Sequence, residues 1–309
     1  MKWTPERIPS QSGKTFVITG GNAGLGLETA TALAAKGGRV VLTARSEEKG
    51  RGAVEAIRAG NASADVELVL LDLADLDSVD RAAAQILATC PRIDAFVNNA
   101  GVMQPPLTRT RQGFELQMGT NHLGHFRLNS LVFDRLEASG GRFVPVSSIT
   151  HEQGRIELAD LNYARRPYDA TQAYSQSKLA NLMYGLELHR RLAARGGRAV
   201  AIPCHPGYAA TNLQSSGVGM EGGSWFLRVL YGVLNPLLAQ PAREGAYALL
   251  LAAADPDAKG GIYYGPTGMG RIRGPVAECP MAPQASDVAV AAALWDASEA
   301  LVGPFFGHR

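Results

Sequence analysis

The sequence has few cysteines and no long hydrophobic run. Its 309 residues include three cysteines, Cys90, Cys204 and Cys279, which are far apart and form no CxxC pair. No disulfide framework is expected, and this usage suits a reducing cytoplasmic environment. The most apolar later stretch, Trp225–Ala239, is short and interrupted by charged and helix-breaking residues, and the polar N-terminus contains no secretory signal. We therefore expect a soluble chain without a membrane anchor.

The chain also lacks a strong excess of charge of either sign. Lysine and arginine number 30 against 28 acidic residues, which gives a formal net charge of +2. No run of basic residues interleaved with aromatics is present, so nucleic acid and anionic membranes are not expected partners. A hydrophobic content of 46% with 19% charged residues is typical of a globular protein with a sizeable core.

What the sequence does contain is an alternation of short apolar runs and longer stretches of helical periodicity. The apolar runs are Thr15–Thr19, Arg39–Thr43, Val66–Leu71, Asp94–Asn98, Arg142–Ser147 and Ala199–Cys204. The helical stretches between them cover 24–36, 47–59, 75–89, 112–137 and 172–195. Strands that alternate with helices indicate βαβ units. The predicted fold is therefore α/β of the Rossmann type, a doubly wound parallel sheet with helices on both faces.

After residue 205 the alternation weakens. Residues 206–240 are rich in glycine and include an apolar helical piece, 225–238. A helix is expected over 242–253 and a last short strand over 261–264, followed by an ordered loop rich in glycine and proline over 265–285. A final helix is expected over about 286–302, with Ser286 or Asp287 as its N-cap.

A glycine-rich turn joins the first predicted strand to the first helix. It comprises Thr19, Gly20, Gly21, Asn22, Ala23, Gly24, Leu25 and Gly26. Glycines let the backbone approach a pyrophosphate, and the helix N-terminus presents free N–H groups to the anion. The turn contains no lysine and no Gly-Lys-Ser/Thr ending, which argues against phosphoryl transfer. A dinucleotide is the expected ligand, although a purely structural glycine turn is the alternative.

Arg45 follows the second predicted strand, where a dinucleotide-binding fold reads the ribose. An acidic residue here would bind a 2′-hydroxyl and repel a 2′-phosphate, whereas an arginine can pair with that phosphate. Lys49 adds a second positive charge one helical turn later. The sequence therefore favours NADP(H), with NADPH preferred over NADH, against the alternative of an ordinary surface arginine.

Seven motifs in order resemble the short-chain dehydrogenase/reductase family over roughly residues 13–265. They are the turn 19–26, Asp72-Leu73, Asn98-Asn99-Ala100-Gly101, Asn121 in Asn121-His122-Leu123-Gly124-His125-Phe126, Ser147-Ser148, Tyr174-Ser175-Gln176-Ser177-Lys178, and Pro206-Gly207 with Thr211. The resemblance implies that Asp72, Leu73, Asn99, Ala100 and Gly101 contact the cofactor. It also implies that Pro206, Gly207 and Thr211 hold the nicotinamide carboxamide.

Within the family the chain is most similar to the retinol-dehydrogenase-like branch. The shared features are the Asn-His-Leu-Gly-His-Phe and Tyr-Ser-Gln-Ser-Lys-Leu-Ala-Asn segments and the long stretch between Ser148 and Tyr174. The extra residues, about 151–170, are expected to form part of the cleft wall. Some animal retinol dehydrogenases carry a membrane anchor that is not seen here, so retinoid specificity is not carried over.

The resemblance assigns catalysis to Ser148, Tyr174, Lys178 and Asn121. Tyr174 would exchange a proton with the substrate oxygen, and Ser148, preferred to Ser147, would hydrogen-bond the same atom. Lys178 lies four residues after Tyr174 on one helix face, so its ammonium is expected to lower the phenol pKa, and it would also bind the nicotinamide ribose. Asn121 would hold a water that links the lysine to solvent.

The expected function is the NADP(H)-dependent interconversion of a ketone or aldehyde and an alcohol. A non-catalytic NADP(H)-binding regulator or scaffold is the alternative; an epimerase or dehydratase fits less well because their turn differs. Segments 104–112, 151–170 and 212–240 are expected to select a small-molecule substrate that is lipophilic or bulky. A metal at His122 and His125 is not expected, because no third ligand follows.

The expected organisation is a single domain over 1–309. Its cofactor-binding part would cover about 13–205, its substrate-cleft segment about 206–240 and its C-terminal extension about 265–309. A homo-oligomer could form through the long helices, but the long segments could block the helix face that such pairing uses, so the sequence leaves the oligomeric state open.

Overall fold

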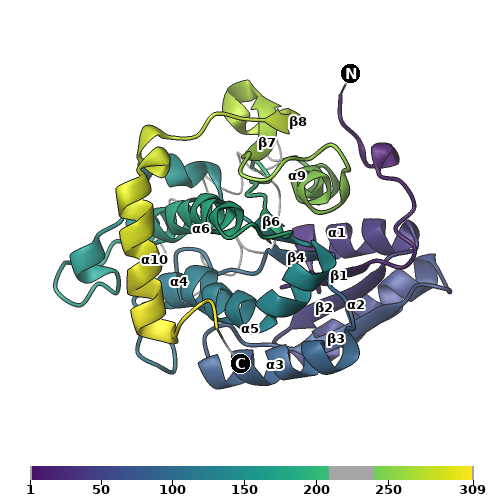
Figure 1. Ribbon diagram of the computed structural model, residues 1–309, viewed down its shortest axis with the longest axis horizontal. Helices are drawn as coiled ribbons and strands as arrows, with labels where there is room; N and C mark the ends of the chain where they lie inside the picture. The colour runs from purple at the N-terminus through teal and green to yellow at the C-terminus, as the bar shows by residue number, and fades with distance from the viewer. Residues whose placement is uncertain (1, 209–239, 308–309) are drawn as a thin grey trace.

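The computed structural model describes residues 2–208 and 240–307 and contains a central sheet of six strands in the order β3-β2-β1-β4-β5-β6 (Figure 1). All neighbouring strands are parallel. The strands are β1 (Thr15–Ile18), β2 (Arg39–Ala44), β3 (Val66–Leu70), β4 (Ala95–Asn98), β5 (Arg142–Pro145) and β6 (Val200–Ala201). Their nearly continuous apolar sequence suits burial on both faces; Phe16, Val17 and Ile18, for example, are buried.

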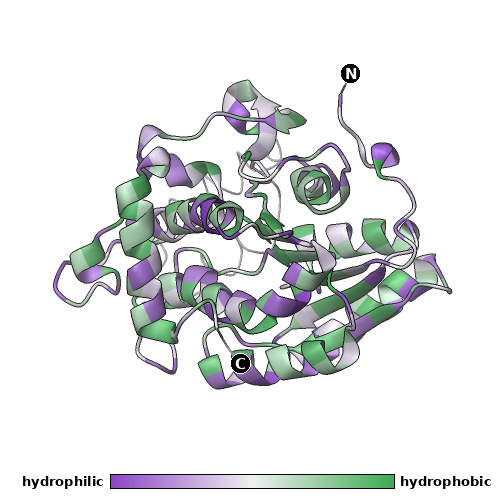
Figure 2. Ribbon diagram, viewed as in Figure 1, coloured by the Kyte–Doolittle hydropathy of each residue, from purple (hydrophilic) through white to green (hydrophobic). Residues whose placement is uncertain are grey.

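Helices cover both faces of the sheet, as a doubly wound fold requires (Figure 1). One face carries α1 (Gly24–Ala35), α2 (Glu47–Gly60) and α9 (Ala242–Ala254), and the other carries α3 (Leu76–Thr89), α5 (Gly124–Ser139) and α6 (Ala170–Ala194). Hydrophobic residues concentrate on the strands and on the helix sides that meet them (Figure 2). The expected α/β architecture is confirmed.

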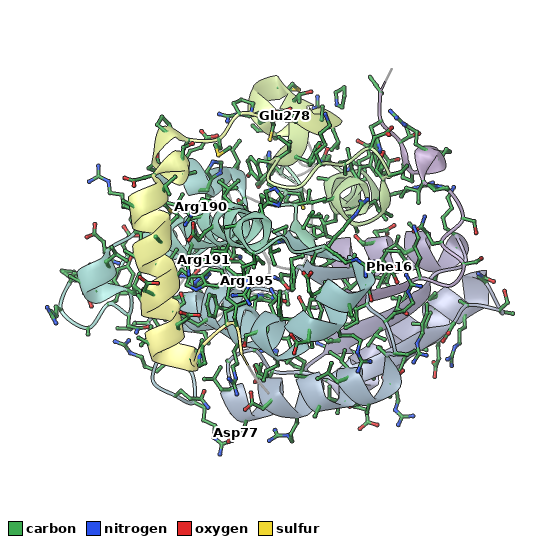
Figure 3. The ribbon with its side chains drawn as sticks, in the orientation of Figure 1. Phe16, Asp77, Arg190, Arg191, Arg195 and Glu278 are labelled. Atoms are coloured by element: carbon green, nitrogen blue, oxygen red, sulfur yellow. The ribbon has the colours of Figure 1, made fainter. Side chains whose placement is uncertain are left out.

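The helix α10 (Val288–Val302) packs against the outside of α6. Arg191 and Arg195, labelled near the C-terminal end of α6 in Figure 3, cover aromatic rings of the C-terminal segment with their guanidinium groups. Arg191 lies 4.5 Å from the centroid of Trp295, and Arg195 lies 4.3 Å from that of Phe306. Such cation–π contacts attach the end of the chain to the C-terminal end of α6.

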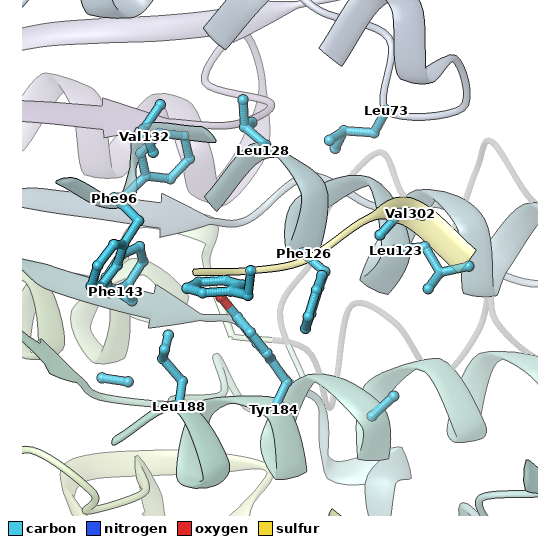
Figure 4. Packing of buried hydrophobic residues seen from close by; sticks show 14 of the residues in the cluster. Leu73, Phe96, Leu123, Phe126, Leu128, Val132, Phe143, Tyr184, Leu188 and Val302 are labelled. Atoms are coloured by element: carbon cyan, nitrogen blue, oxygen red, sulfur yellow. The ribbon is translucent and has the colours of Figure 1, made fainter. Parts of the chain in front are cut away.

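An aromatic core fills the space between α5, α6 and the C-terminal segment (Figure 4). The ring of Phe126 lies edge-on to Trp295 at 5.0 Å and to Phe305 at 5.1 Å. Tyr184 stacks on Trp295 at 6.0 Å. Because aromatic pairs in these geometries add to the free energy gained by burial, the C-terminal residues are part of the core.

The expected helix over 112–137 is wrong in its first part. The chain forms a short helical turn, α4 (Leu116–Met118), then a π-helical segment, η2 (Gly119–Leu123), and only then α5. The buried Glu115 carboxylate accepts hydrogen bonds from the N–H groups of Gln117 and Met118 and so begins the helix there. The periodicity of the sequence does not distinguish a π-helical turn from an α-helix.

The segment after β6 also differs from expectation. The β6 strand is shorter than 199–204, and Cys204 forms only isolated bridges to Val146 and Tyr264. Instead of a strand over 261–264 and a loop over 265–285, β7 (Tyr264–Gly268) and β8 (Arg273–Glu278) form an antiparallel hairpin. Short helices η5 (Met269–Arg271) and η6 (Pro283–Ser286) accompany it. The glycines and prolines that suggested a loop lie in a separate two-stranded sheet, where they are tolerated.

The final helix begins at Val288, and its N-cap is Asp287, whose carboxylate accepts a hydrogen bond from Val290 N at 3.0 Å. Ser286 instead ends η6. The remaining short helices are η1 (Pro5–Arg7), η3 (Ile149–Gln153) and η4 (Leu158–Asp160). The apolar helix expected at 225–238 lies outside the described residues.

Candidate active site

The glycine-rich turn lies at the carboxyl end of β1, beside β4, where the order of the sheet reverses. Gly20 and Gly24 have φ values of +64° and +52°, which favour glycine. A Cβ on Gly26 would collide with the carbonyl oxygen of Gly20 and lie 2.7 Å from Asn99 Nδ2. The N-cap residue Ala23 offers no side-chain acceptor, so the first N–H groups of α1 are available to an anion. This backbone fits a pyrophosphate, with Asn22 and Leu25 inside the same turn.

Thr19 ties the turn to the segment after β4. Its hydroxyl oxygen accepts hydrogen bonds from the N–H groups of Asn99 and Ala100, each at 3.0 Å. The Asn99 amide in turn donates to the Thr19 carbonyl oxygen at 2.8 Å. The two predicted cofactor motifs are therefore one hydrogen-bonded unit.

His125 joins this unit to Asn121, a contact that the sequence analysis missed. Its Nδ1 lies 3.0 Å from the Asn121 carbonyl oxygen and its Nε2 lies 2.8 Å from the Thr19 hydroxyl. A carbonyl oxygen only accepts, so Nδ1 carries the proton and Nε2 accepts from Thr19. Burial lowers the pKa of His125 to about 3, which keeps the ring neutral at physiological pH.

His122 points elsewhere, so the HxxH spacing does not bring two ligands together. Its Nε2 lies 2.9 Å from the Ser298 hydroxyl of α10. Within residues 2–208 and 240–307, no group of three or more His, Cys, Asp or Glu side chains is arranged to hold a metal ion. The only signal that could have identified His125 is its position four residues after Asn121, on the same helix face.

The residues expected to contact the adenine and its ribose lie at the carboxyl ends of β2 and β3, on the same edge of the sheet as the glycine-rich turn after β1. Arg45 is exposed directly after β2, and Lys49 is exposed in the first turn of α2, which Ser46 caps. Asp72 follows β3 and accepts a hydrogen bond from Ala74 N at 2.9 Å, while Leu73 is buried. The structure thus brings the predicted adenine and ribose residues to one edge.

Ser148, Tyr174 and Lys178 come together beyond the end of β5. The side chain of Ser148 lies beside the phenol of Tyr174 and acts to lower the pKa of that phenol. The neighbouring Ser147 hydroxyl donates instead to the Lys178 carbonyl oxygen at 2.7 Å. The Lys178 Nζ lies 5.7 Å from the Tyr174 ring centroid and donates to the Val146 carbonyl oxygen at 3.2 Å. The preference for Ser148 over Ser147 agrees with this geometry.

Burial controls the protonation of both helix residues. It raises the pKa of Tyr174 to about 12, and Ser148 offsets only part of that rise. It lowers the pKa of Lys178 to about 8, because the ammonium loses hydration. The net pKa of the phenol is therefore raised and not lowered as expected, because desolvation outweighs the effects that favour the phenolate. The phenol is protonated at neutral pH and available as a proton donor.

The side chain of Asn121 is fully engaged. Its Oδ1 accepts from Val102 N at 2.8 Å, and its Nδ2 donates to the Val102 carbonyl oxygen at 3.0 Å and to the Ser177 hydroxyl at 2.9 Å. A Cβ on Gly101 would lie 2.9 Å from Asn121 Oδ1 and 3.7 Å from Lys178 Nζ. Asn121, Gly101 and Lys178 are thus close neighbours. The Asn121 amide links the segment of Gly101 and Val102 to the helix that carries Ser177 and Lys178.

Pro206 and Gly207 follow β6, and Gly207 packs against Pro266 and the Ile272 carbonyl oxygen of the β7–β8 hairpin. Gly207 has a φ of +72°, and its N–H donates to His205 Nδ1 at 3.2 Å. The Pro206 carbonyl oxygen accepts from the Gln240 amide at 2.5 Å. Thr211, the third residue expected here, lies outside the described residues, as does most of segment 212–240.

Over the described ranges, 2–208 and 240–307, the chain has no helix that combines the length and the apolar character needed to cross a membrane.

Comparisons with known proteins agree with this geometry. The sequence profile of the short chain dehydrogenase family matches residues 14–221. The chain is 38% identical to human retinol dehydrogenase 13 over 94% of this chain and 85% of that protein. It is 38% identical to mouse polyprenol dehydrogenase over 83% of this chain and 76% of that protein. An uncharacterized protein from Mycobacterium paratuberculosis has a similar crystal structure, with a TM-score of 0.80, 40% identity and 98% coverage of both chains.

Members of this family bind a nicotinamide dinucleotide, NAD or NADP, and act on alcohol and carbonyl groups. The turn that fits a pyrophosphate and the hydroxyl pair beside a buried lysine are the features that such chemistry needs. The chain belongs to the short-chain dehydrogenase/reductase family and is an oxidoreductase of alcohol and carbonyl groups.

Proposed function

We propose that this protein is an NADP(H)-dependent oxidoreductase that interconverts a lipophilic ketone or aldehyde and the corresponding alcohol. The observation that carries the proposal is the placement of Ser148 beside the Tyr174 phenol, with the buried ammonium of Lys178 5.7 Å from the Tyr174 ring centroid. A cofactor-binding scaffold without turnover would have no need of this arrangement.

In the direction of reduction, Tyr174 donates its phenolic proton to the carbonyl oxygen. Ser148 donates a second hydrogen bond to the same oxygen and stabilises the charge that develops there. Lys178 stabilises the resulting phenolate, since a positive charge nearby favours the ionised form. In the direction of alcohol oxidation, the phenolate accepts the hydroxyl proton.

The cofactor would be held by the turn Gly20–Gly26 at its pyrophosphate, by Asp72 at adenine and by Lys178 at the nicotinamide ribose. When bound, it supplies the hydride. Arg45 and Lys49, both exposed at the end of β2, would pair with a 2′-phosphate, and this charge supports NADPH over NADH.

The proposed lipophilic substrate is supported by the names of two relatives, which refer to retinol and polyprenol. Tyr163 and Tyr168, in the long segment before α6 that is expected to form part of the cleft wall, pack edge-on with their ring centroids 5.2 Å apart.

The Tyr174→Phe variant tests the reaction. Loss of the proton donor should reduce NADPH oxidation across a panel of aldehydes and ketones by at least about 100-fold, because general acid catalysis contributes on that order. Tyr184→Phe is the matched control, since Tyr184 is a buried phenol on the same helix, bonded to Asn129 at 2.9 Å. Full activity in Tyr174→Phe would contradict the catalytic assignment.

The Arg45→Asp variant tests the cofactor preference. It should weaken NADPH binding by about 10- to 100-fold, the value of one or two charge-assisted contacts, and should leave NADH binding equal or stronger. The dissociation constants are measured by fluorescence titration. Arg81→Asp, on the opposite face of the sheet in α3, controls for net charge. Unchanged affinity for both cofactors in Arg45→Asp would show that Arg45 does not read the phosphate.

A further inference from the structure

The segment that follows Ser148 is held by a buried histidine. His151, in the short helix η3, is 1% exposed. Its Nδ1 lies 2.7 Å from the Ser148 carbonyl oxygen, and its Nε2 accepts from the backbone N–H of Ala282 at 3.2 Å. The ring therefore bridges the serine and a residue 131 positions later in the chain.

The two partners fix the state of the imidazole. A backbone N–H only donates and a carbonyl oxygen only accepts, so Nε2 is unprotonated and Nδ1 carries the proton. The ring is neutral, because burial lowers the pKa of His151. Tyr263 packs edge-on against it at 5.5 Å, so a turned ring would lose both hydrogen bonds and this contact.

Two further contacts from the C-terminal part of the chain reach the same segment. The Gln284 amide in η6 donates to the Glu152 carbonyl oxygen at 2.8 Å. The Arg271 guanidinium, in the turn between β7 and β8, pairs with the Glu152 carboxylate at 2.6 Å. Segment 149–154 is thus tied to 271, 282 and 284 by separate groups.

The C-terminal partners in these contacts, Arg271, Ala282 and Gln284, lie beyond the residues that the family profile matches, which end at 221. We propose that His151 is a positioning residue, and that residues 271–286 of the C-terminal extension set the orientation of Ser148 through it. The proposal rests on the proposed function only in the role it gives the Ser148 hydroxyl. The Ser148 oxygen also accepts from Thr150 N at 3.3 Å, so a displacement of segment 149–154 reaches the hydroxyl directly.

Hydrogen–deuterium exchange tests the bridge without any substrate. His151→Phe removes both bonds, and exchange of peptides covering 149–154 and 281–285 should quicken at least about tenfold. Gln284→Leu, which leaves His151 intact, should quicken exchange in 149–154 and provides the test if His151→Phe does not fold. Asp287→Ala, which removes the cap of α10, is the control: it lowers the Tm but should leave exchange in 149–154 unchanged. Exchange at the wild-type rate in both His151→Phe and Gln284→Leu would overturn the proposal.

Kinetics then separates positioning from general stability. With NADPH and a carbonyl substrate that the wild type reduces, kcat of His151→Phe should fall at least about tenfold, because small displacements of a catalytic group are costly, while the NADPH dissociation constant stays unchanged. His151→Asn keeps an amide donor near the Nδ1 position and should recover most of kcat, although exchange at 281–285 stays fast. Equal kcat in wild type and His151→Phe would overturn the role of His151. A wild type without turnover would contradict the proposed function alone, since the exchange experiment still decides whether the bridge exists.

Discussion

Neutral buried histidines connect the parts of this site. His125 joins the cofactor turn to the helix of Asn121, and His151 joins Ser148 to the C-terminal extension. In each ring Nδ1 donates to a carbonyl oxygen and Nε2 accepts. An imidazole in this state fits between one donor and one acceptor, which an amine or a carboxylate does not.

The His125→Phe variant should weaken NADPH binding by about 5- to 100-fold, because two buried groups lose a partner at a cost of about 1–3 kcal/mol. Isothermal titration calorimetry measures the effect. The matched control is His122→Phe, three residues earlier and equally buried, whose imidazole bonds Ser298 instead. Equal losses of NADPH affinity in the two variants would show that the Thr19–His125 contact has no specific role.

Sequence reasoning found the residues of the site that belong to short local patterns. The structure brings Ser148, Tyr174 and Lys178 together and places the glycine-rich turn at the end of β1. The roles of His125 and His151 were not predictable, because each ring has one partner nearby in the sequence and a second partner 106 or 131 residues away. No local spacing signals such a contact.

At the scale of elements, α6 supplies both Tyr174 and Lys178, and its first turn is fixed by a cap. The Asp169 carboxylate accepts hydrogen bonds from Thr171 N at 2.8 Å and Gln172 N at 3.1 Å. These bonds satisfy two N–H groups that would otherwise lack a helical partner.

The Asp169→Ala variant should lose about 1 kcal/mol of the free energy of unfolding, typical of an N-cap, with kcat nearly unchanged. Differential scanning calorimetry should show a Tm lower by about 1–2 °C for a protein of this size. Asp169→Asn, which keeps a capping oxygen, should stay within about half of that change. A loss in Asp169→Asn as large as in Asp169→Ala would mean that the cap oxygen does not account for the stability.

The pattern of apolar runs and helical stretches predicted most of the sheet, but it did not predict the irregular helix start before α5 or the hairpin after β6. Five strands and their helices begin and end within a few residues of expectation, because apolar periodicity reports burial directly. The π-helical turn at 119–123 and the β7–β8 hairpin were missed. Both depend on tertiary contacts: Gly124 packs against the Leu73 carbonyl oxygen, and Tyr264 bridges to Cys204.

On the scale of the whole molecule, the C-terminal extension closes the fold around α6. The outer surface of α6 is covered by Trp295, which packs on Phe305 and contacts Arg191 of the helix. An oligomer built through α6 would have to use a surface other than the one that α10 covers. The division into a single domain stays a prediction.

The molecule should lose stability on mild acidification. Burial lowers the pKa of His122 to about 4 and those of His125 and His205 to about 3, while unfolded histidine titrates near 6.5. Below pH 6.5 the unfolded chain binds protons that the folded chain does not. The free energy of unfolding is therefore highest above this pH and falls as the pH is lowered toward 4. At pH 5 each of these histidines lowers the free energy of unfolding by about 2 kcal/mol.

Thermal unfolding between pH 8 and pH 5 checks this expectation. Carboxylates of the unfolded chain titrate below this window, and the raised pKa of the buried Glu115 would stabilise the fold on acidification, so a fall in Tm between pH 6.5 and 5 reports the histidines. A Tm that stays constant from pH 8 to pH 5 would contradict the neutral, buried state assigned to them.

The most direct test of the central claim follows the hydride itself. The protein is incubated with NADPH carrying deuterium at nicotinamide C4 and with a panel of lipophilic aldehydes and ketones, and the alcohols are analysed by mass spectrometry. We predict one deuterium on the carbinol carbon with wild type and Tyr184→Phe, and none above background with Tyr174→Phe. Tight NADPH binding without deuterium transfer to any substrate would contradict the assignment of an oxidoreductase and would favour a cofactor-binding scaffold.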